Sequence, residues 1–207
     1  MLKELIKIKD GLLDILWPKM CLDCGEEGRY ICSNCEVFLS EVDMSRTDIV
    51  SMWEYEGLIK KLINKIKKEG CYDIINELME KIFMKTEFAL PENTYITYVP
   101  MRERKLRSKG FNLSELIARK VGEKVNKPVV NLLKKIKENR SQEDLGVAER
   151  RENVKDVFAV REDCICPANV LLVDDFLVSG TTMRECFGIL KSAGVKKVFG
   201  FTLARVI

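Results

Sequence analysis

The chain has 207 residues, which is enough for one full domain and a smaller additional piece. Hydrophobic residues make up 46% of it, as in globular proteins, and a net charge of +3 excludes a polyanionic tail or a histone-like basic coat. Histidine is absent, so catalytic triads that need it, histidine-bearing zinc sites and imidazole acid–base chemistry are excluded.

The first segment, residues 2–17, places leucine and isoleucine at mostly helical spacing, which predicts a short amphipathic helix that ends before Pro18. Charged side chains interrupt its apolar run, so it lacks the core of a signal peptide, and no segment of the chain is apolar enough for a membrane span. We therefore expect a cytoplasmic protein. Its eight cysteines are then better interpreted as metal ligands or buried hydrophobic residues than as disulfides.

Strand and helix patterns alternate along the rest of the chain. The predicted strands are 49–55, 95–99, 129–133, 157–160, 170–173 and 198–203. The predicted helices are a lysine-rich one ended by Gly70, one at 72–88, one that begins after Asn112 and one ended by Gly194. The predicted loops are a basic one at 100–110 and a long polar one at 139–155. This alternation predicts an α/β domain with a mostly parallel sheet over residues 46–207, preceded by a separate element over residues 1–45.

Four cysteines lie within fifteen residues as two Cys-x-x-Cys pairs: Cys21, Cys24, Cys32 and Cys35. Each pair can turn two sulfurs toward one point, and two pairs complete a tetrahedron around Zn²⁺. The seven-residue spacer is shorter than the usual ~15–20 residues. The alternatives are two redox pairs or four unrelated thiols. Because four thiolates close the coordination shell, we expect Zn²⁺ in a structural role.

The strand at 170–173 is followed by two acids, Asp174 and Asp175, and then by a turn rich in hydroxyl groups and glycine at 178–182. Such a turn before a helix directs N–H groups, hydroxyls and the helix dipole toward one point, which favours a phosphate monoester. Two nearby carboxylates can accept hydrogen bonds from sugar hydroxyls, directly or through Mg²⁺. The segment therefore predicts a site for ribose 5-phosphate.

Other interpretations of this segment fit less well. A P-loop needs Gly-Lys-Ser/Thr, and a Rossmann fingerprint needs Gly-x-Gly-x-x-Gly. In a receiver domain the acid pair ends the first strand, whereas here only 32 residues follow Asp175. An ordinary strand–turn–helix without a ligand remains an alternative.

Four motifs along the chain form one pattern. They are the cysteine pairs just after Trp17-Pro18, the basic run that ends in Lys109-Gly110-Phe111-Asn112, the residues Gln142, Leu145, Arg150, Asn153 and Phe158, and the acid-pair segment. The acid-pair segment resembles the phosphoribosyl pyrophosphate (PRPP) signature of type I phosphoribosyltransferases. The complete chain resembles the ComF/GntX family, which joins a four-cysteine zinc element to a phosphoribosyltransferase-like domain.

This resemblance implies a type I phosphoribosyltransferase-like sheet and a set of site residues. Asp174 and Asp175 would be the catalytic acids and would bind the ribose hydroxyls or Mg²⁺. The further PRPP-binding residues that it implies are Val178, Ser179, Gly180, Thr181, Thr182, Arg102 and Arg104. The loop at 139–155 takes the place of the flexible hood, which closes over the site to exclude water; its alternative is a surface loop without that role.

Two positions depart from the family's pattern. Family members often have a histidine near the position of Arg102. Related enzymes frequently carry threonine at the position of Val178, so one hydroxyl donor is lost here, and we expect weaker phosphate binding.

The basic run places five cations in eight residues, namely Arg102, Arg104, Lys105, Arg107 and Lys109. In the resembled fold this loop faces the pyrophosphate, whose departing charge needs cations and Mg²⁺. The alternatives are a solvated charged loop and contact with a nucleic-acid backbone, which uses the same residue types.

Three functions are compatible with these observations. The resemblance implies a PRPP-binding protein of the ComF type, either a phosphoribosyltransferase or a non-catalytic descendant, that assists uptake of transforming single-stranded DNA alongside a helicase partner. The second is an adaptor that binds DNA or protein and carries a ribose-phosphate sensor site. The third is a nucleotide-salvage enzyme, for which the sequence shows no nucleobase signature.

Overall fold

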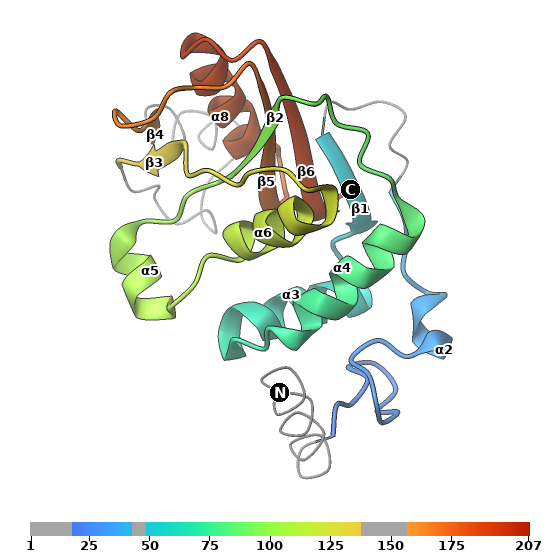
Figure 1. Cartoon of the computed structure of the whole chain (residues 1–207). Coiled ribbons are helices and arrows are strands. Elements are labelled where there is room, and N and C mark those ends of the chain that lie inside the picture. Colours follow the sequence, from blue (N-terminus) through green and yellow to red (C-terminus); the bar gives the residue numbers. More distant parts are fainter. Residues whose placement is uncertain (1–17, 43–48, 138–156) are drawn as a thin grey trace, which may run out of the picture.

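The computed structural model describes residues 18–42, 49–137 and 157–207 (Figure 1). Its centre is a four-stranded sheet in the order β1-β6-β5-β2, in which every pairing is parallel. The strands are β1 Ile49–Glu54, β2 Thr94–Tyr98, β5 Asn169–Leu177 and β6 Lys197–Arg205. The predicted fold class, a mostly parallel sheet with flanking helices behind a small four-cysteine element, is confirmed. The predicted helix at 2–17 and the hood loop at 139–155 lie outside the described residues.

Helices cover both faces of the sheet (Figure 1). One face packs against α3 Gly57–Glu69, α4 Asp73–Lys85 and α6 Leu113–Val125, and the other against α8 Thr181–Ser192. Along β5, Val170 and Leu172 enter the core beside α8, whereas Leu171 and Val173 enter the core beside α6. Because successive strand residues point to opposite faces, a strand covered on both faces must be apolar throughout, as the sequence predicted.

The predicted helix boundaries agree closely with the structure. Helix α3 buries one apolar stripe and ends at Gly70, which takes the left-handed conformation (φ 68°). Helix α6 begins after Asn112, whose side-chain oxygen accepts a hydrogen bond from the N–H of Ser114 at 3.2 Å. This cap fixes the direction in which the first turn of α6 enters the domain.

The predicted loop at 100–110 is wrong for most of its length. Residues Glu103–Lys109 form helix α5, between an extended Arg102 and a left-handed Gly110 (φ 79°). A 3.4 Å contact between Glu103 and Arg107, one helical turn apart, supports it. No residue of α5 is buried, so its sequence has no apolar periodicity from which a helix could be predicted.

The predicted strand at 129–133 is also wrong. The chain runs beside β2 only briefly, where the N–H of Ile96 donates to Pro128 at 2.9 Å and the N–H of Val130 donates to Ile96 at 2.8 Å. It then leaves the main sheet. Strand β3 is Leu133–Lys135 and pairs antiparallel with β4, Phe158–Val160, in a separate two-stranded sheet.

The four-cysteine element packs directly on α3 and α4. It contains one short helix, α2 Ser33–Glu36, and its Ile31 is fully buried in the core that also holds Trp53. Glu77 of α4 accepts hydrogen bonds from the backbone N–H groups of Tyr30 and Ile31 at 3.0–3.2 Å. Whether residues 1–45 form a separate folding unit stays a prediction. In the described ranges, the helices are too short or too polar to cross a membrane.

Candidate functional site

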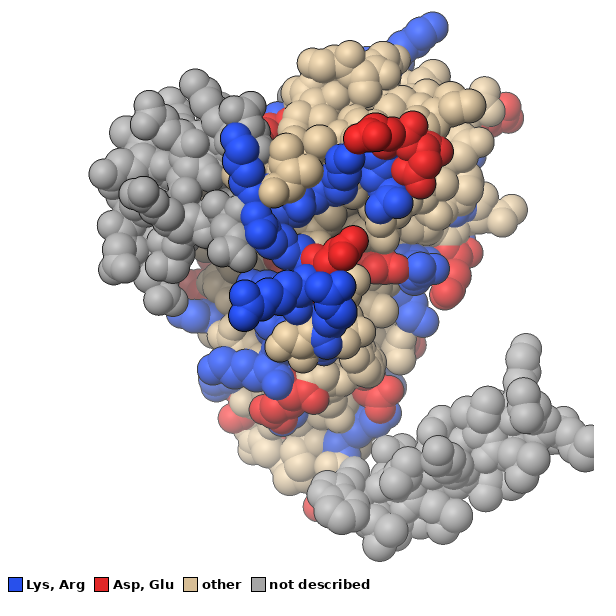
Figure 2. Space-filling model, turned by 90° about the vertical axis from the view of Figure 1, so that its left-hand side faces the viewer, with Lys and Arg blue, Asp and Glu red and all other residues tan. Residues whose placement is uncertain are grey.

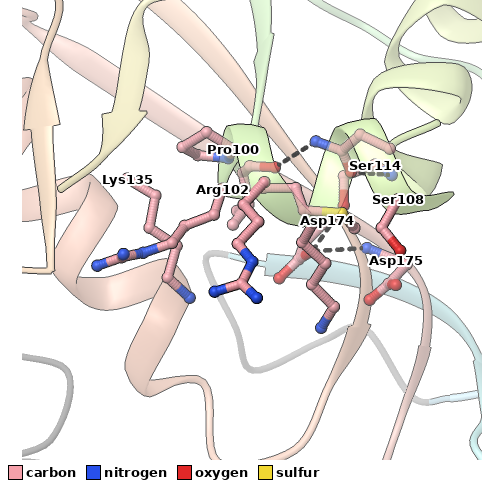
Figure 3. A pocket seen from close by; sticks show the side chains of 12 residues that line it. Pro100, Arg102, Ser108, Ser114, Lys135, Asp174 and Asp175 are labelled. Carbon is pink, nitrogen blue, oxygen red and sulfur yellow. Dashed lines mark hydrogen bonds between the residues drawn. The ribbon is translucent and has the colours of Figure 1, made fainter. Parts of the chain in front are cut away.

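A cavity of about 620 Å³ opens beside the carboxyl ends of β2 and β5 (Figure 3). It is lined by Val99, Pro100, Met101, Arg102, Arg104, Lys105, Ser108, Asn112, Ser114, Lys135, Asp174 and Asp175. The chain leaves β2 toward α5 and α6, whereas it leaves β5 toward α8 on the opposite face. Neighbouring parallel strands whose connections diverge in this way leave a crevice at their carboxyl ends, which is where ligands bind in open α/β sheets.

The two acids lie inside β5 and do not follow its end, which corrects the prediction of a strand that stops at residue 173. Strand β2 ends at Tyr98, opposite Val173, but β5 continues beside β6 to Leu177. At Asp174 and Asp175 the strand therefore keeps β6 as its neighbour and no longer has β2. This one-sided pairing exposes the acids to the cavity while β6 still fixes their backbone.

The carboxylate of Asp174 is held by two hydrogen bonds to one oxygen. Its Oδ1 accepts from the hydroxyl of Ser114 and from the N–H of Asp175, each at 2.9 Å. Burial and then the charge of Asp175 raise the pKa of Asp174 to about 7. Asp174 therefore changes charge near neutral pH, where the charged form can accept hydrogen bonds from a ligand and the neutral form can donate one.

Asp175 is held in a different way. Its Oδ1 accepts from the N–H of Phe176 at 2.7 Å, and its Oδ2 forms an ion pair with Lys67 of α3. The ammonium of Lys67 also lies 4.1 Å from the centre of the Phe176 ring, and Tyr55 stacks on that ring at 4.2 Å with 9° between the planes. With both Lys67 and Tyr55 against it, the Phe176 ring is not an open platform for a nucleobase.

The turn after β5 forms a second, smaller cavity of about 170 Å³, lined by residues 174–183. Gly180 is left-handed (φ 71°) and directly precedes α8. The hydroxyls of Ser179 and Thr181 are 2.8 Å apart, and the N–H of Thr181 points to Ser179 Oγ at 3.4 Å. Hydroxyls and the N-terminus of a twelve-residue helix thus meet beside the acids, an arrangement suited to an anion. Val178 is exposed and contributes no side-chain donor.

Among the described residues, four cations line the larger cavity. Lys and Arg side chains gather on the face of the molecule shown in Figure 2. Arg102, Arg104 and Lys105 approach from the start of α5, and Lys135 approaches from β3. Burial and the charges of Lys105 and Arg102 lower the pKa of Lys135. Because these positive charges repel one another, an anionic ligand that neutralises them will be favoured.

Sequence reasoning missed several residues of this site, of which three carry chemistry that the site uses. Ser114 and Lys135 line the cavity, and Lys67 pairs with Asp175. Only Ser114 could have been identified from the sequence, because it lies two residues after the predicted N-cap of a helix that follows the basic run. Of the five predicted cations, Arg107 and Lys109 are not among the lining residues of the cavity.

The four cysteines of the N-terminal element meet at one point, with all four sulfurs within 4.8 Å of one another. Gly25 and Gly28 have positive φ angles of 79° and 106°, which the tight turns around the sulfurs require. Burial opposes ionisation of Cys21, but the N–H groups of Cys32, Cys24 and Asp23 outweigh it and lower its pKa to about 6. This donor set fits a thiolate-binding metal, and the cluster can hold a metal such as zinc.

Comparison with known proteins supports the resemblance seen in the motifs. The chain is 27% identical over 195 residues to Competence protein F of Haemophilus influenzae, a match that covers 89% of this chain and 84% of that protein. It is 24% identical over 201 residues to Competence protein ComFC of Streptococcus pneumoniae, which covers 95% of this chain and 85% of that protein. The resemblance to the ComF family is confirmed. No protein-family model matches the chain.

Two solved structures are also similar to part of this ComF-like chain. One is an allosteric regulatory enzyme of purine biosynthesis, with 22% identity and a TM-score of 0.39 over 60% of this chain and 24% of that chain. The other is the glutamine PRPP amidotransferase of B. subtilis complexed with ADP and GMP, with 18% identity and a TM-score of 0.38 over 60% of this chain and 25% of that one.

Proposed function

We propose that this chain is a PRPP-binding protein of the ComF type. One observation carries the proposal: Asp174 and Asp175 line both cavities, with the hydroxyl-rich turn on one side and the cations of the α5 segment on the other. PRPP has the same order of groups, a 5-phosphate, a ribose with two hydroxyls and a pyrophosphate. The turn would bind the 5-phosphate, the acids would bind the hydroxyls, and Arg102 and Arg104 would face the pyrophosphate.

Magnesium fits the acid pair of this proposal. Carboxylate oxygens are the ligands that Mg²⁺ prefers, and it is commonly bound by one or two carboxylates together with substrate phosphates. Both hydrogen bonds that Asp174 forms with described residues are accepted by Oδ1, which leaves Oδ2 for a metal or a hydroxyl. Asp174 and Asp175 would hold the ion, which when bound would neutralise charge on the pyrophosphate.

The reaction of PRPP can be catalysed by a chain without histidine. Displacement at the anomeric carbon breaks the bond to pyrophosphate through an oxocarbenium-like state, and it requires no protein nucleophile. The cations near the cavity would stabilise the departing charge. The test is a pyrophosphate-release assay with PRPP, Mg²⁺ and a panel of nucleobases, with and without single-stranded DNA. Release would establish a phosphoribosyltransferase, and saturable PRPP binding without release would establish a sensor that kept the site and lost the reaction.

The names of the two relatives support a role in competence. We therefore propose a cytoplasmic protein that assists uptake of transforming single-stranded DNA with a helicase partner, and that carries structural Zn²⁺ in the four-cysteine cluster. The clustered Lys and Arg side chains on the face shown in Figure 2 support contact with a nucleic-acid backbone. An adaptor that uses this surface without turnover remains the alternative.

Charge reversal in α5 tests the DNA contact. In the double variant Arg104→Glu/Arg107→Glu, affinity for single-stranded DNA will fall without dependence on its sequence, because phosphate contacts carry no base information. The salt dependence will also weaken, by a slope of roughly 0.7 for each phosphate that the variant no longer neutralises. Fluorescence anisotropy at several salt concentrations measures both. The matched control, Lys191→Glu/Lys196→Glu in the last turn of α8 and in the connection from α8 to β6, should bind as the wild type does. Unchanged binding in the α5 variant would move the DNA-binding surface elsewhere.

Binding of ribose 5-phosphate will strengthen as the pH rises from about 6 to about 8, because the raised pKa of Asp174 keeps much of that carboxyl protonated at the lower pH. The carboxylate that accepts hydrogen bonds from the ribose hydroxyls forms only as the pH passes about 7. Calorimetric titration across this range measures the effect. Asp174→Asn is the control, because asparagine does not titrate, whereas the phosphate of the ligand titrates equally in both experiments. Parallel profiles for the wild type and this variant would contradict the prediction.

A further inference from the structure

Lys67 lies in a chemical setting unlike that of the other lysines on α3. Its side chain is 25% exposed and contacts a carboxylate that is itself only 17% exposed. The same ammonium lies over the Phe176 ring, which is fixed in turn by the stacked ring of Tyr55. An ion pair shielded in this way is screened by salt much less than an exposed pair such as Lys65–Glu69 on the same helix.

The ion pair makes the two acids unequal. Both oxygens of Asp175 have partners within the protein, the N–H of Phe176 and the ammonium of Lys67. Asp174, in contrast, uses one oxygen for both of its hydrogen bonds within the described part of the chain. Lys67 thus gives Asp175 a partner of opposite charge within the protein, and its charge offsets part of the repulsion between the neighbouring carboxylates.

We propose that Lys67 is a positioning residue of the ligand site: it neutralises and orients Asp175, and so leaves Asp174 as the acid that receives the ribose hydroxyls. This inference rests on the proposed binding of a ribose phosphate. Loss of Lys67 would leave Asp175 without its ion-pair partner beside a cavity lined by Arg102, Arg104 and Lys105. Its carboxylate would then compete with the anionic ligand for those cations.

The experiment is a double-mutant cycle between Lys67→Met and Asp175→Asn. Affinity of the full chain for ribose 5-phosphate with Mg²⁺ is measured by calorimetry in the wild type, both single variants and the double variant. Lys67→Met should weaken binding about tenfold, which corresponds to about 1.4 kcal/mol. In the Asp175→Asn background it should cause no further loss, because asparagine has no charge to neutralise. Lys67→Arg should restore most of the affinity.

Lys68→Met is the matched control, because it removes the same charge from an exposed position on the same helix. It should bind as the wild type does. If Lys67 acted only as a positive charge that attracts the ligand, Lys67→Met would weaken binding equally with and without Asp175. Equal losses in the two backgrounds, or an equal loss in Lys68→Met, would overturn the proposal.

The melting temperatures of the same four proteins are also measured without ligand. This measurement tests the ion pair independently of the proposed binding of ribose phosphate. Non-additive changes in melting temperature are expected, since the ion pair exists before any ligand binds. Additive changes would contradict the pairing itself. If the changes in melting temperature are non-additive but the protein binds no ribose phosphate, the ion pair is supported. The proposed function, and with it the positioning role of Lys67, would then be refuted.

Discussion

Cys24→Ser will abolish metal binding and unfold the N-terminal element while the sheet domain stays folded. Within the described residues 18–42 the element has little regular structure: one four-residue helix and the isolated bridges Met20–Glu27 and Glu41–Trp53. Its fold would therefore depend on metal ligation, which in small four-ligand elements contributes on the order of 10 kcal/mol to folding. We expect one Zn²⁺ per wild-type chain and fast hydrogen exchange over residues 18–42 in the variant, with protection retained in β5 and β6.

Cys164→Ser is the control for this experiment, because Cys164 lies outside the four-cysteine cluster. It should keep both the metal and the protected N-terminal amides. Elemental analysis that finds well under one zinc per purified wild-type chain would contradict the metal assignment. Loss of protection throughout β5 and β6 in Cys24→Ser would contradict the prediction that the sheet domain folds without the element.

Asp174→Asn will weaken PRPP binding by roughly ten- to a hundredfold, since a charge-assisted hydrogen bond contributes about 1.5–3 kcal/mol. Asp175→Asn will also weaken it, because the ion pair through which Lys67 orients the acid pair is lost. Asp174→Asn should not lower the ligand-free melting temperature much, whereas Asp175→Asn should lower it through loss of the ion pair with Lys67. Burial already disfavours the charge of Asp174, and asparagine removes that penalty. Calorimetry with Mg²⁺ and PRPP measures the affinities, and differential scanning calorimetry measures the melting temperatures.

Glu103→Gln supplies the matched control for the acid pair. Its carboxylate is 86% exposed on α5, close to the cavity but not among its lining residues. It should bind PRPP as the wild type does. If Glu103→Gln and the two aspartate variants lose affinity equally, the effect reflects overall charge and the acid pair has no specific role.

The parts of the fold that sequence reasoning recovered are those where burial dictates residue type. The apolar run at 170–173 lies in a strand covered on both faces, and the stripe on α3 faces the core. The same reasoning failed at α5, because a helix without a buried face has no periodic pattern of apolar residues in its sequence. It failed again at 129–133, where β-prone residues follow the edge of β2 for only a few positions.

The site was predictable only where consecutive residues carry the chemistry. Asp174, Asp175 and the following turn form one continuous motif, so their spacing alone indicated a phosphate and a diol. Ser114, Lys135 and Lys67 reach the same place from α6, β3 and α3. Lys67 is one of five lysines on its helix, and only the packing of α3 against β5 distinguishes it from the others.

Calorimetric titration of Mg²⁺-PRPP into the full-length, metal-loaded chain tests the central claim most directly. The account predicts saturable binding at one site per chain. It also predicts a rise in melting temperature with ligand concentration, equivalent to about 2.7 kcal/mol of stabilisation at a hundred times Kd, which the double variant Asp174→Asn/Asp175→Asn should lack. A folded, zinc-loaded wild-type protein that shows neither heat of binding nor a shift in melting temperature at millimolar Mg²⁺-PRPP would contradict it.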